Sequence, residues 1–92
     1  MPNYLVERYL PGRDRAWLES GLARIPRGRP EVTYLGSTYL PSAESCLCRF
    51  EAETEDDVRD ANEIADVPFA RIVAAEEIGA RQPGSTEKGE AS

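Results

Sequence analysis

Apolar residues recur along this chain with two different periods, and each period predicts one kind of secondary structure. Four segments are rich in aromatic and β-branched residues, and we predict them to be strands, over residues 4–10, 31–40, 45–52 and 71–78. Two other segments carry apolar residues three or four positions apart, which is the spacing of one helix face. These apolar residues are Leu18, Leu22 and Ile25 in the first segment, and Val58, Ala61, Ile64 and Ala65 in the second.

Polar residues and prolines set the ends of the two predicted helices. Asp14 can cap the first helix, and Pro26 ends it. Thr54 can cap the second helix, and Pro68 ends it. The acidic residues 55–57 suit the positive end of that helix's dipole. The sequence therefore predicts where both helices begin and end.

Two glycines inside predicted elements indicate local departures from regular structure. Gly21 costs its helix about 1 kcal/mol relative to alanine, so we expect a close packing contact there. Gly36 interrupts the second strand, where it indicates a bulge or a close backbone approach.

The predicted order of elements is strand, helix, strand, strand, helix, strand. This βαββαβ order folds most simply as an α+β ferredoxin-like domain, with a four-stranded antiparallel sheet and both helices on one face. The expected strand order is fourth, first, third, second. We expect the domain to span residues 1–79, and residues 80–92, which hold no large apolar residue, to form a disordered tail. The open sheet face must then be polar or be covered by a partner.

The amino-acid composition excludes histidine-dependent sites and argues against anionic partners. The 92 residues contain no histidine, which excludes Ser–His and Cys–His nucleophile pairs and an imidazole metal site. Seventeen acidic residues against eleven basic ones give a formal net charge of −6, so we expect neither nucleic acid nor an anionic membrane surface as a partner. The chain shows no signal-peptide pattern and no stretch long enough to span a bilayer, which favours a cytoplasmic protein.

The two cysteines form the first candidate site. Cys46 and Cys48 stand two residues apart on a predicted strand, too far apart for an undistorted disulfide, which also favours a reducing compartment. Strand alternation places Glu44, Cys46 and Cys48 on the same face as Phe50, beneath the helices. One interpretation is a metal site for Ni²⁺ or a similar ion, made of two thiolates with Glu44. The other is that both cysteines are small buried hydrophobes.

A second candidate site lies on the open face of the sheet. If Val6 faces the helices, then Glu7 and Tyr9 face away from them, as does Arg49. Glu7 and Arg49 can then be cross-strand neighbours, one as a base or metal ligand and the other as a binding group for an anion. Arg8 competes for this role if the register is shifted by one residue. The alternative interpretation is a structural ion pair, worth about 0–1 kcal/mol in solvent.

Hydroxyl groups on the second strand can line the same open-face pocket. Ser37 and Tyr39 are the candidates. Without histidine, Ser37 has no evident activating base, so we expect it to bind a ligand rather than to act as a nucleophile.

Several segments resemble a family of small bacterial ferredoxin-like proteins of unknown function that includes actinobacterial nickel-binding members. The resemblance extends over about residues 3–78. It rests on residues 45–52 (SCLCRFEA), 67–73 (VPFARIV), 4–8 (YLVER) and 34–37 (YLGS), together with Val58, Ala61 and Asn62. It implies the ferredoxin-like fold, a homodimer and, as a possible cofactor, nickel.

Two functions from different classes follow. The first is a small non-catalytic protein that binds a metal ion or a small polar ligand, acting as a homodimer with a pocket on the open sheet face. The second is a small cofactor-free enzyme of the dimeric α/β-barrel kind, such as a cyclase, isomerase or monooxygenase, with Glu7 as base and Arg49 steadying an enolate. An interaction module without a ligand is a third option. We favour the first.

Overall fold

The computed structural model describes residues 1–28 and 30–79, and the predicted tail over residues 80–92 lies outside the described residues. The predicted strands and helices are present in the predicted order, with one short helix added. The strands are β1 (Asn3–Tyr9), β2 (Thr33–Leu40), β3 (Ser45–Glu51) and β4 (Arg71–Ala75). The helices are α1 (Arg15–Leu22), α2 (Ile25–Gly28) and α3 (Glu55–Ile64), with a 3-10 turn η1 over Pro41–Ala43.

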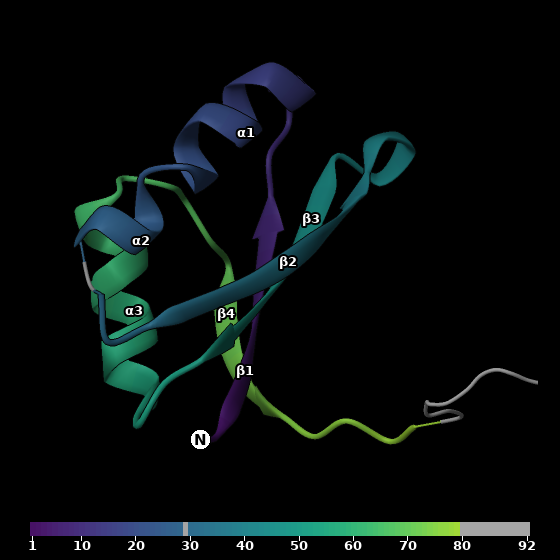
Figure 1. Ribbon diagram of the computed structural model, residues 1–92. Coiled ribbons are helices and arrows are strands. Elements are labelled where there is room, and N and C mark those ends of the chain that lie inside the picture. The colour runs from purple at the N-terminus through teal and green to yellow at the C-terminus, as the bar shows by residue number, and fades with distance from the viewer. Residues whose placement is uncertain (29, 80–92) are drawn as a thin grey trace, which may run out of the picture.

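All strand pairs are antiparallel, and the order across the sheet is β2-β3-β1-β4. The helices lie on one side of this sheet (Figure 1). The predicted ferredoxin-like α+β fold and its strand order are therefore confirmed. Three strands are shorter than predicted: β2 begins at Thr33, β3 ends at Glu51 and β4 ends at Ala75. No helix within the described ranges is long and apolar enough to cross a membrane.

The register of the two central strands decides which side chains face the helices. Val6 pairs with Cys48, and Arg8 pairs with Cys46. All four of these side chains are buried, with 2% of Arg8 and none of the other three exposed. Paired residues of an antiparallel ladder point to the same face, so the inner face of the sheet carries an arginine among apolar groups and thiols.

The hydrophobic core fills the space between the sheet and the helices. Full burial of one valine, leucine, isoleucine or phenylalanine side chain stabilises the fold by about 1.5–3 kcal/mol. The buried apolar side chains include Val6, Leu10, Leu18, Leu22, Ile25, Val32, Phe50, Val58, Val67 and Ile72. The periodic positions of both predicted helices contribute to this set, with one exception, because Ile64 is exposed.

Helix α1 begins as predicted but ends earlier. The Asp14 carboxylate accepts a hydrogen bond from the Trp17 backbone N–H at 2.8 Å, so Asp14 is the N-cap. The helix ends at Leu22 rather than next to Pro26. Pro26 instead lies in the first turn of α2, where a residue needs no N–H donor. Pro26 therefore marks the beginning of α2 and not the end of α1.

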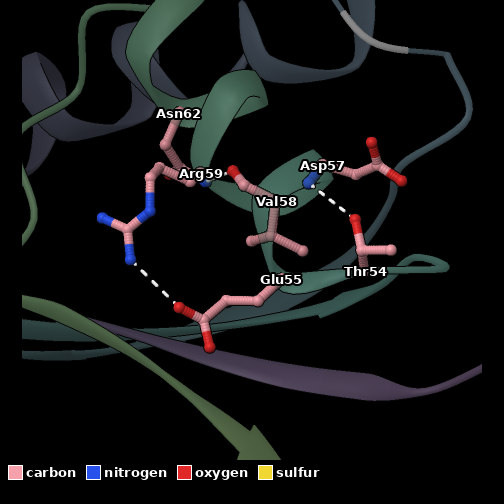
Figure 2. Close-up of polar contacts among 6 residues, drawn as sticks. All are labelled: Thr54, Glu55, Asp57, Val58, Arg59 and Asn62. Atoms are coloured by element: carbon pink, nitrogen blue, oxygen red, sulfur yellow. Dashed lines mark hydrogen bonds and ion pairs between the residues drawn. The ribbon is translucent and has the colours of Figure 1, made fainter.

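Helix α3 begins with the predicted cap. Figure 2 shows the Thr54 hydroxyl accepting a hydrogen bond from the Asp57 backbone N–H, at 3.1 Å. One turn along the same helix, Arg59 forms an ion pair with Glu55 at 3.0 Å (Figure 2). Such a surface pair contributes at most a few tenths of a kcal/mol, so the cap does more to fix where α3 begins.

Both glycine predictions are confirmed. A Cβ atom on Gly21 would lie 3.0 Å from Val67 Cγ2, so glycine lets α1 approach the segment after α3. In β2 the register against β3 shifts between Tyr34 and Gly36, which leaves Leu35 as the extra residue of a β-bulge. Gly36 has a φ of +140°, a conformation that side-chain-bearing residues rarely adopt.

Replacing Gly36 with alanine should therefore weaken the fold. We expect Gly36→Ala to lower the free energy of unfolding by about 1–3 kcal/mol, measured by urea denaturation, because the backbone is strained at this φ. Thr38→Ala, on the same strand, should stay within about 0.5 kcal/mol of the native chain. Equal stability of Gly36→Ala and the native chain would contradict this interpretation of the bulge.

Candidate functional site

The feature that stands out under the helices is a buried arginine. Arg8 projects from β1 into the core, and only 2% of the residue is exposed. A buried charge costs several kcal/mol unless hydrogen bonds and a counter-ion compensate it. The partners of Arg8 therefore determine what this region can do.

Every nitrogen of the Arg8 guanidinium donates a hydrogen bond. Nε donates to Cys48 Sγ at 3.4 Å. Nη1 donates to the backbone carbonyls of Val67 and Pro68, at 3.3 and 3.2 Å. Nη2 donates to the Asn62 side-chain oxygen. Within the described residues no carboxylate bonds to Arg8, so its partners are oxygens without formal charge and one sulfur.

Asn62 is fixed by its own helix. Its side-chain nitrogen donates to the Val58 carbonyl at 2.7 Å, one turn earlier in α3. Both residues are fully buried, and Figure 2 shows them on the same helix as the Thr54 cap. The amide oxygen is thus left to accept from Arg8, and α3 is tied to the inner face of the sheet.

The two thiols lie beside Arg8 on β3. Cys46 Sγ and Cys48 Sγ are 3.6 Å apart and fully buried. The Ser37 hydroxyl donates to Cys48 Sγ at 2.8 Å. Ser37 also bonds to the Tyr34 hydroxyl, and since the single Ser37 proton points at sulfur, Tyr34 is the donor in that bond. The hydroxyls of Tyr34 and Ser37 therefore form a hydrogen-bonded series that ends at Cys48 Sγ.

These contacts separate the acidities of the two thiols. The hydrogen bond from Cys46 lowers the pKa of Cys48 to about 6, although burial opposes the shift, and Arg8 and Ser37 lower it further. The pKa of Cys46 is raised, by its hydrogen bond to Cys48 and by burial. Burial also raises the pKa of the Tyr34 hydroxyl. The same contacts therefore favour the thiolate at Cys48 and the neutral thiol at Cys46, and Arg8 lies beside the sulfur that ionises more readily.

Hollows open on two sides of this cluster. One, of about 480 Å³, lies between α1 and β2 and is lined by Leu18, Tyr34, Ser37 and Tyr39 among others. The other, of about 440 Å³, is lined by residues 62–63 and 66–69. Neither cysteine lines the first hollow, but Ser37 does, and its hydroxyl bonds to Cys48.

Two of the predicted pocket residues lie on the opposite face from the one we expected. Ser37 pairs with Cys48, and Tyr39 pairs with Cys46, so both belong to the inner face. The physical reason is the bulge at Leu35, because one extra residue exchanges the two faces of the strand beyond it. The hydroxyl-lined hollow is therefore beneath the helices.

The remaining pocket candidates do lie on the open face, but Glu7 has a different partner. Glu7 pairs in register with Leu47 and Arg71, and its carboxylate is 2.8 Å from Arg71 Nε. Arg49 pairs with Leu5 and lies over Gly36 instead. Glu7 and Arg49 therefore share the open face as diagonal neighbours, and the ion pair of Glu7 is with Arg71.

Tyr9, the last open-face candidate, is exposed at the end of β1.

Glu44 does not join the thiols. It follows η1 in a left-handed conformation, with a φ of +51°, and its carboxylate accepts a hydrogen bond from the Gly12 backbone N–H at 3.2 Å. The predicted alternation stops short of this residue because β3 begins at Ser45. Among the described residues, no three His, Cys, Asp or Glu side chains gather in a way that could hold a metal ion.

The sequence did contain a signal for the buried arginine. Arg8 stands two residues after Val6, and alternate residues of a strand share a face. Charged residues are almost never fully buried without a partner, and a thiol is an uncommon partner for an arginine. The residue type alone therefore predicts an exposed position for Arg8.

The ionisation of Cys48 can be tested through its hydrogen bond to Cys46. In the metal-free protein, thiolate absorbance of Cys46→Ser should rise with a midpoint near pH 6, because serine keeps a donor beside Cys48. Cys46→Ala removes that donor, so its midpoint should move upward toward the ordinary thiol value. Arg8, Ser37 and Tyr34 are the other polar groups at this sulfur and are unchanged in both variants. Identical midpoints would contradict the assigned hydrogen bond.

Comparison with known proteins shows to which family the chain belongs. No curated protein matches it. The crystal structure of SCO4226 from Streptomyces coelicolor A3(2) matches with a TM-score of 0.67 at 15% sequence identity, over 84% of this chain and 99% of that one, which shows a shared fold. The family model described as "Nickel responsive protein SCO4226-like" matches residues 4–74. The chain belongs to the SCO4226-like family of nickel-responsive proteins.

Proposed function

We propose that this protein is a small non-catalytic metal-binding protein whose ligands are the thiolates of Cys46 and Cys48. The observation that carries the proposal is the 3.6 Å separation of the two Sγ atoms. Two sulfurs bound to one tetrahedral ion at about 2.3 Å lie roughly 3.8 Å apart. The thiols therefore already stand at the spacing that a shared ion requires.

The surroundings of Cys48 support the same proposal. Metal ions bind thiolates rather than thiols, and a cation beside a cysteine favours the thiolate. Arg8 supplies that cation at 3.4 Å from Cys48 Sγ. The hollow lined by Ser37 lies one side chain away from Cys48 Sγ. The name of the family adds a link between metals and relatives of this chain.

Nickel itself does not fit the donors that one chain provides. Ni²⁺ favours imidazole and a four-coordinate or larger donor set, and the sequence has no histidine. In the part of the chain that the structure describes, no third thiolate or carboxylate joins Cys46 and Cys48. The positive charge of Arg8 beside Cys48 further opposes a divalent ion. We therefore assign the thiol pair to a soft ion without naming nickel.

We also propose that the open sheet face pairs with a second copy of the chain, as the family resemblance implies. The helices leave this face of the sheet uncovered (Figure 1). Its half-buried apolar centre is formed by Leu5, Leu47 and Val73. The Glu7–Arg71 ion pair lies beside them. A face with an apolar centre and both signs of charge suits a two-fold contact with itself.

The contacts of Glu7 do not support the enzyme alternative. Arg71 donates two hydrogen bonds to the Glu7 carboxylate, at 2.8 and 3.3 Å, so Glu7 would have to leave this partner before it could act as a base.

We propose that the protein is located in the cytoplasm, because a reducing compartment would keep both thiols available for binding.

Metal binding can be measured by anaerobic titration of the reduced protein with Ag(I) and Cd(II). We expect one ion per chain, with thiolate-to-metal absorption in the ultraviolet. Cys46→Ser and Cys48→Ser should each weaken binding by about tenfold or more, since even outer-shell changes cost about 10–100-fold. Ile64→Ser, at an exposed position of α3 outside both the thiol pair and the open face, should leave binding unchanged. Binding of both ions that ignores Cys48→Ser would contradict the proposal.

The homodimer can be tested by sedimentation equilibrium. Leu5→Glu places a carboxylate at the apolar centre of the open face, in register with Arg49. Burying this charge in an interface should weaken self-association by about tenfold or more, a change of about 1.4 kcal/mol in binding free energy. Ser20→Glu adds the same charge on the exposed side of α1 and should leave the association unchanged. A native chain that sediments as a monomer at all concentrations would refute the dimer.

A further inference from the structure

We propose that the ion held by Cys46 and Cys48 is a monovalent soft cation of the Cu(I) or Ag(I) class, selected by the fixed charge of Arg8. This inference rests on the proposed function and specifies its ligand. It depends on three observations, which are the burial of Arg8, the identity of its partners, and the number of donors around the two sulfurs.

The charges of the buried cluster balance only for a monovalent ion. The guanidinium of Arg8 keeps its charge at all relevant pH values. Two bound thiolates contribute −2, Arg8 contributes +1, and an ion of charge +1 brings the cluster to zero. A divalent ion would leave one uncompensated positive charge in a region where Arg8, Cys46 and Cys48 are at most 2% exposed. Such a charge is costly because no solvent reaches it.

Arg8 cannot easily move away from the ion. Its Nη atoms are held by Asn62 and by the carbonyls of Val67 and Pro68. Its Nε stays at 3.4 Å from Cys48 Sγ. The repulsion between two cations at such short range grows as the surroundings exclude water, so each added unit of ionic charge is felt strongly.

The donor count leads to the same ion class. Thiolates select soft ions, with Cu(I) and zinc among the first-row metals. Zinc completes four ligands, and within the described residues no third thiolate or carboxylate joins Cys46 and Cys48. Sulfurs 3.6 Å apart do not suit a linear ion with two ligands, so the bound ion needs a third donor, and the Ser37 hydroxyl, 2.8 Å from Cys48 Sγ, is the candidate. On binding, two metal–sulfur bonds form, and any thiol proton still present leaves to solvent. No electron is transferred.

The experiment compares two soft ions that differ in charge. Ag(I) and Cd(II) are titrated anaerobically into the native chain and into Arg8→Met, and the ratio of their affinities is measured. Removing the fixed positive charge should shift that ratio toward Cd(II) by about tenfold or more. The ratio isolates the charge effect, because a change in the thiolates themselves affects both ions.

Two further variants keep the test decisive. Arg8→Lys retains a positive charge, and its ratio should stay close to that of the native chain. Arg8→Gln is neutral but can still bond to Asn62, and it replaces Arg8→Met if circular dichroism shows that Arg8→Met is unfolded.

An unchanged affinity ratio in a folded neutral variant would overturn charge selection while leaving thiol binding intact. Native affinity for Cd(II) equal to that for Ag(I) would overturn it without any variant. Failure of both ions to bind would refute the proposed function itself.

Discussion

The interaction on which this structure depends is the contact between a buried arginine and a buried cysteine whose pKa is lowered. Arg8 has almost no contact with solvent, and within the described residues its charge meets no carboxylate. A guanidinium cannot lower its cost by losing a proton, so the surroundings have to supply the compensation. Neutral oxygens provide hydrogen bonds, and Cys48 Sγ accepts the hydrogen bond of Nε. Arg8 in turn lowers the pKa of Cys48, so the two groups favour each other's charged form.

This pairing also joins the two layers of the fold. The guanidinium reaches from β1 to Cys48 on β3, to Asn62 on α3, and to the chain that follows α3. Asn62 in turn is held by a carbonyl of its own helix. The same contacts that satisfy the charge therefore fix α3 against the sheet and fix the positions of both sulfurs. Stability and the chemistry of the thiols are consequences of one network.

The sequence predicted the fold well because the fold depends on periodicity, caps and turns. Thr54 and Asp14 act where they were expected to act, and Gly36 marks the bulge. The site was harder to predict, because it depends on which face each residue occupies. The extra residue at Leu35 exchanges the faces of β2 and moves Ser37 beneath the helices. Glu7 found a partner in β4, which alternation within single strands could not identify.

Membership in a nickel-responsive family and a donor set that does not suit nickel are compatible in physical terms. The family relationship fixes the backbone, and the backbone fixes where β1 and β3 face each other. It does not fix which side chains stand there, and ion preference depends on those side chains. In this chain a permanent positive charge stands beside two sulfurs and no imidazole is present. In the proposed site Arg8 would set the valence of the ion, because the charge of the ion and the charge of the guanidinium would together have to match two thiolates.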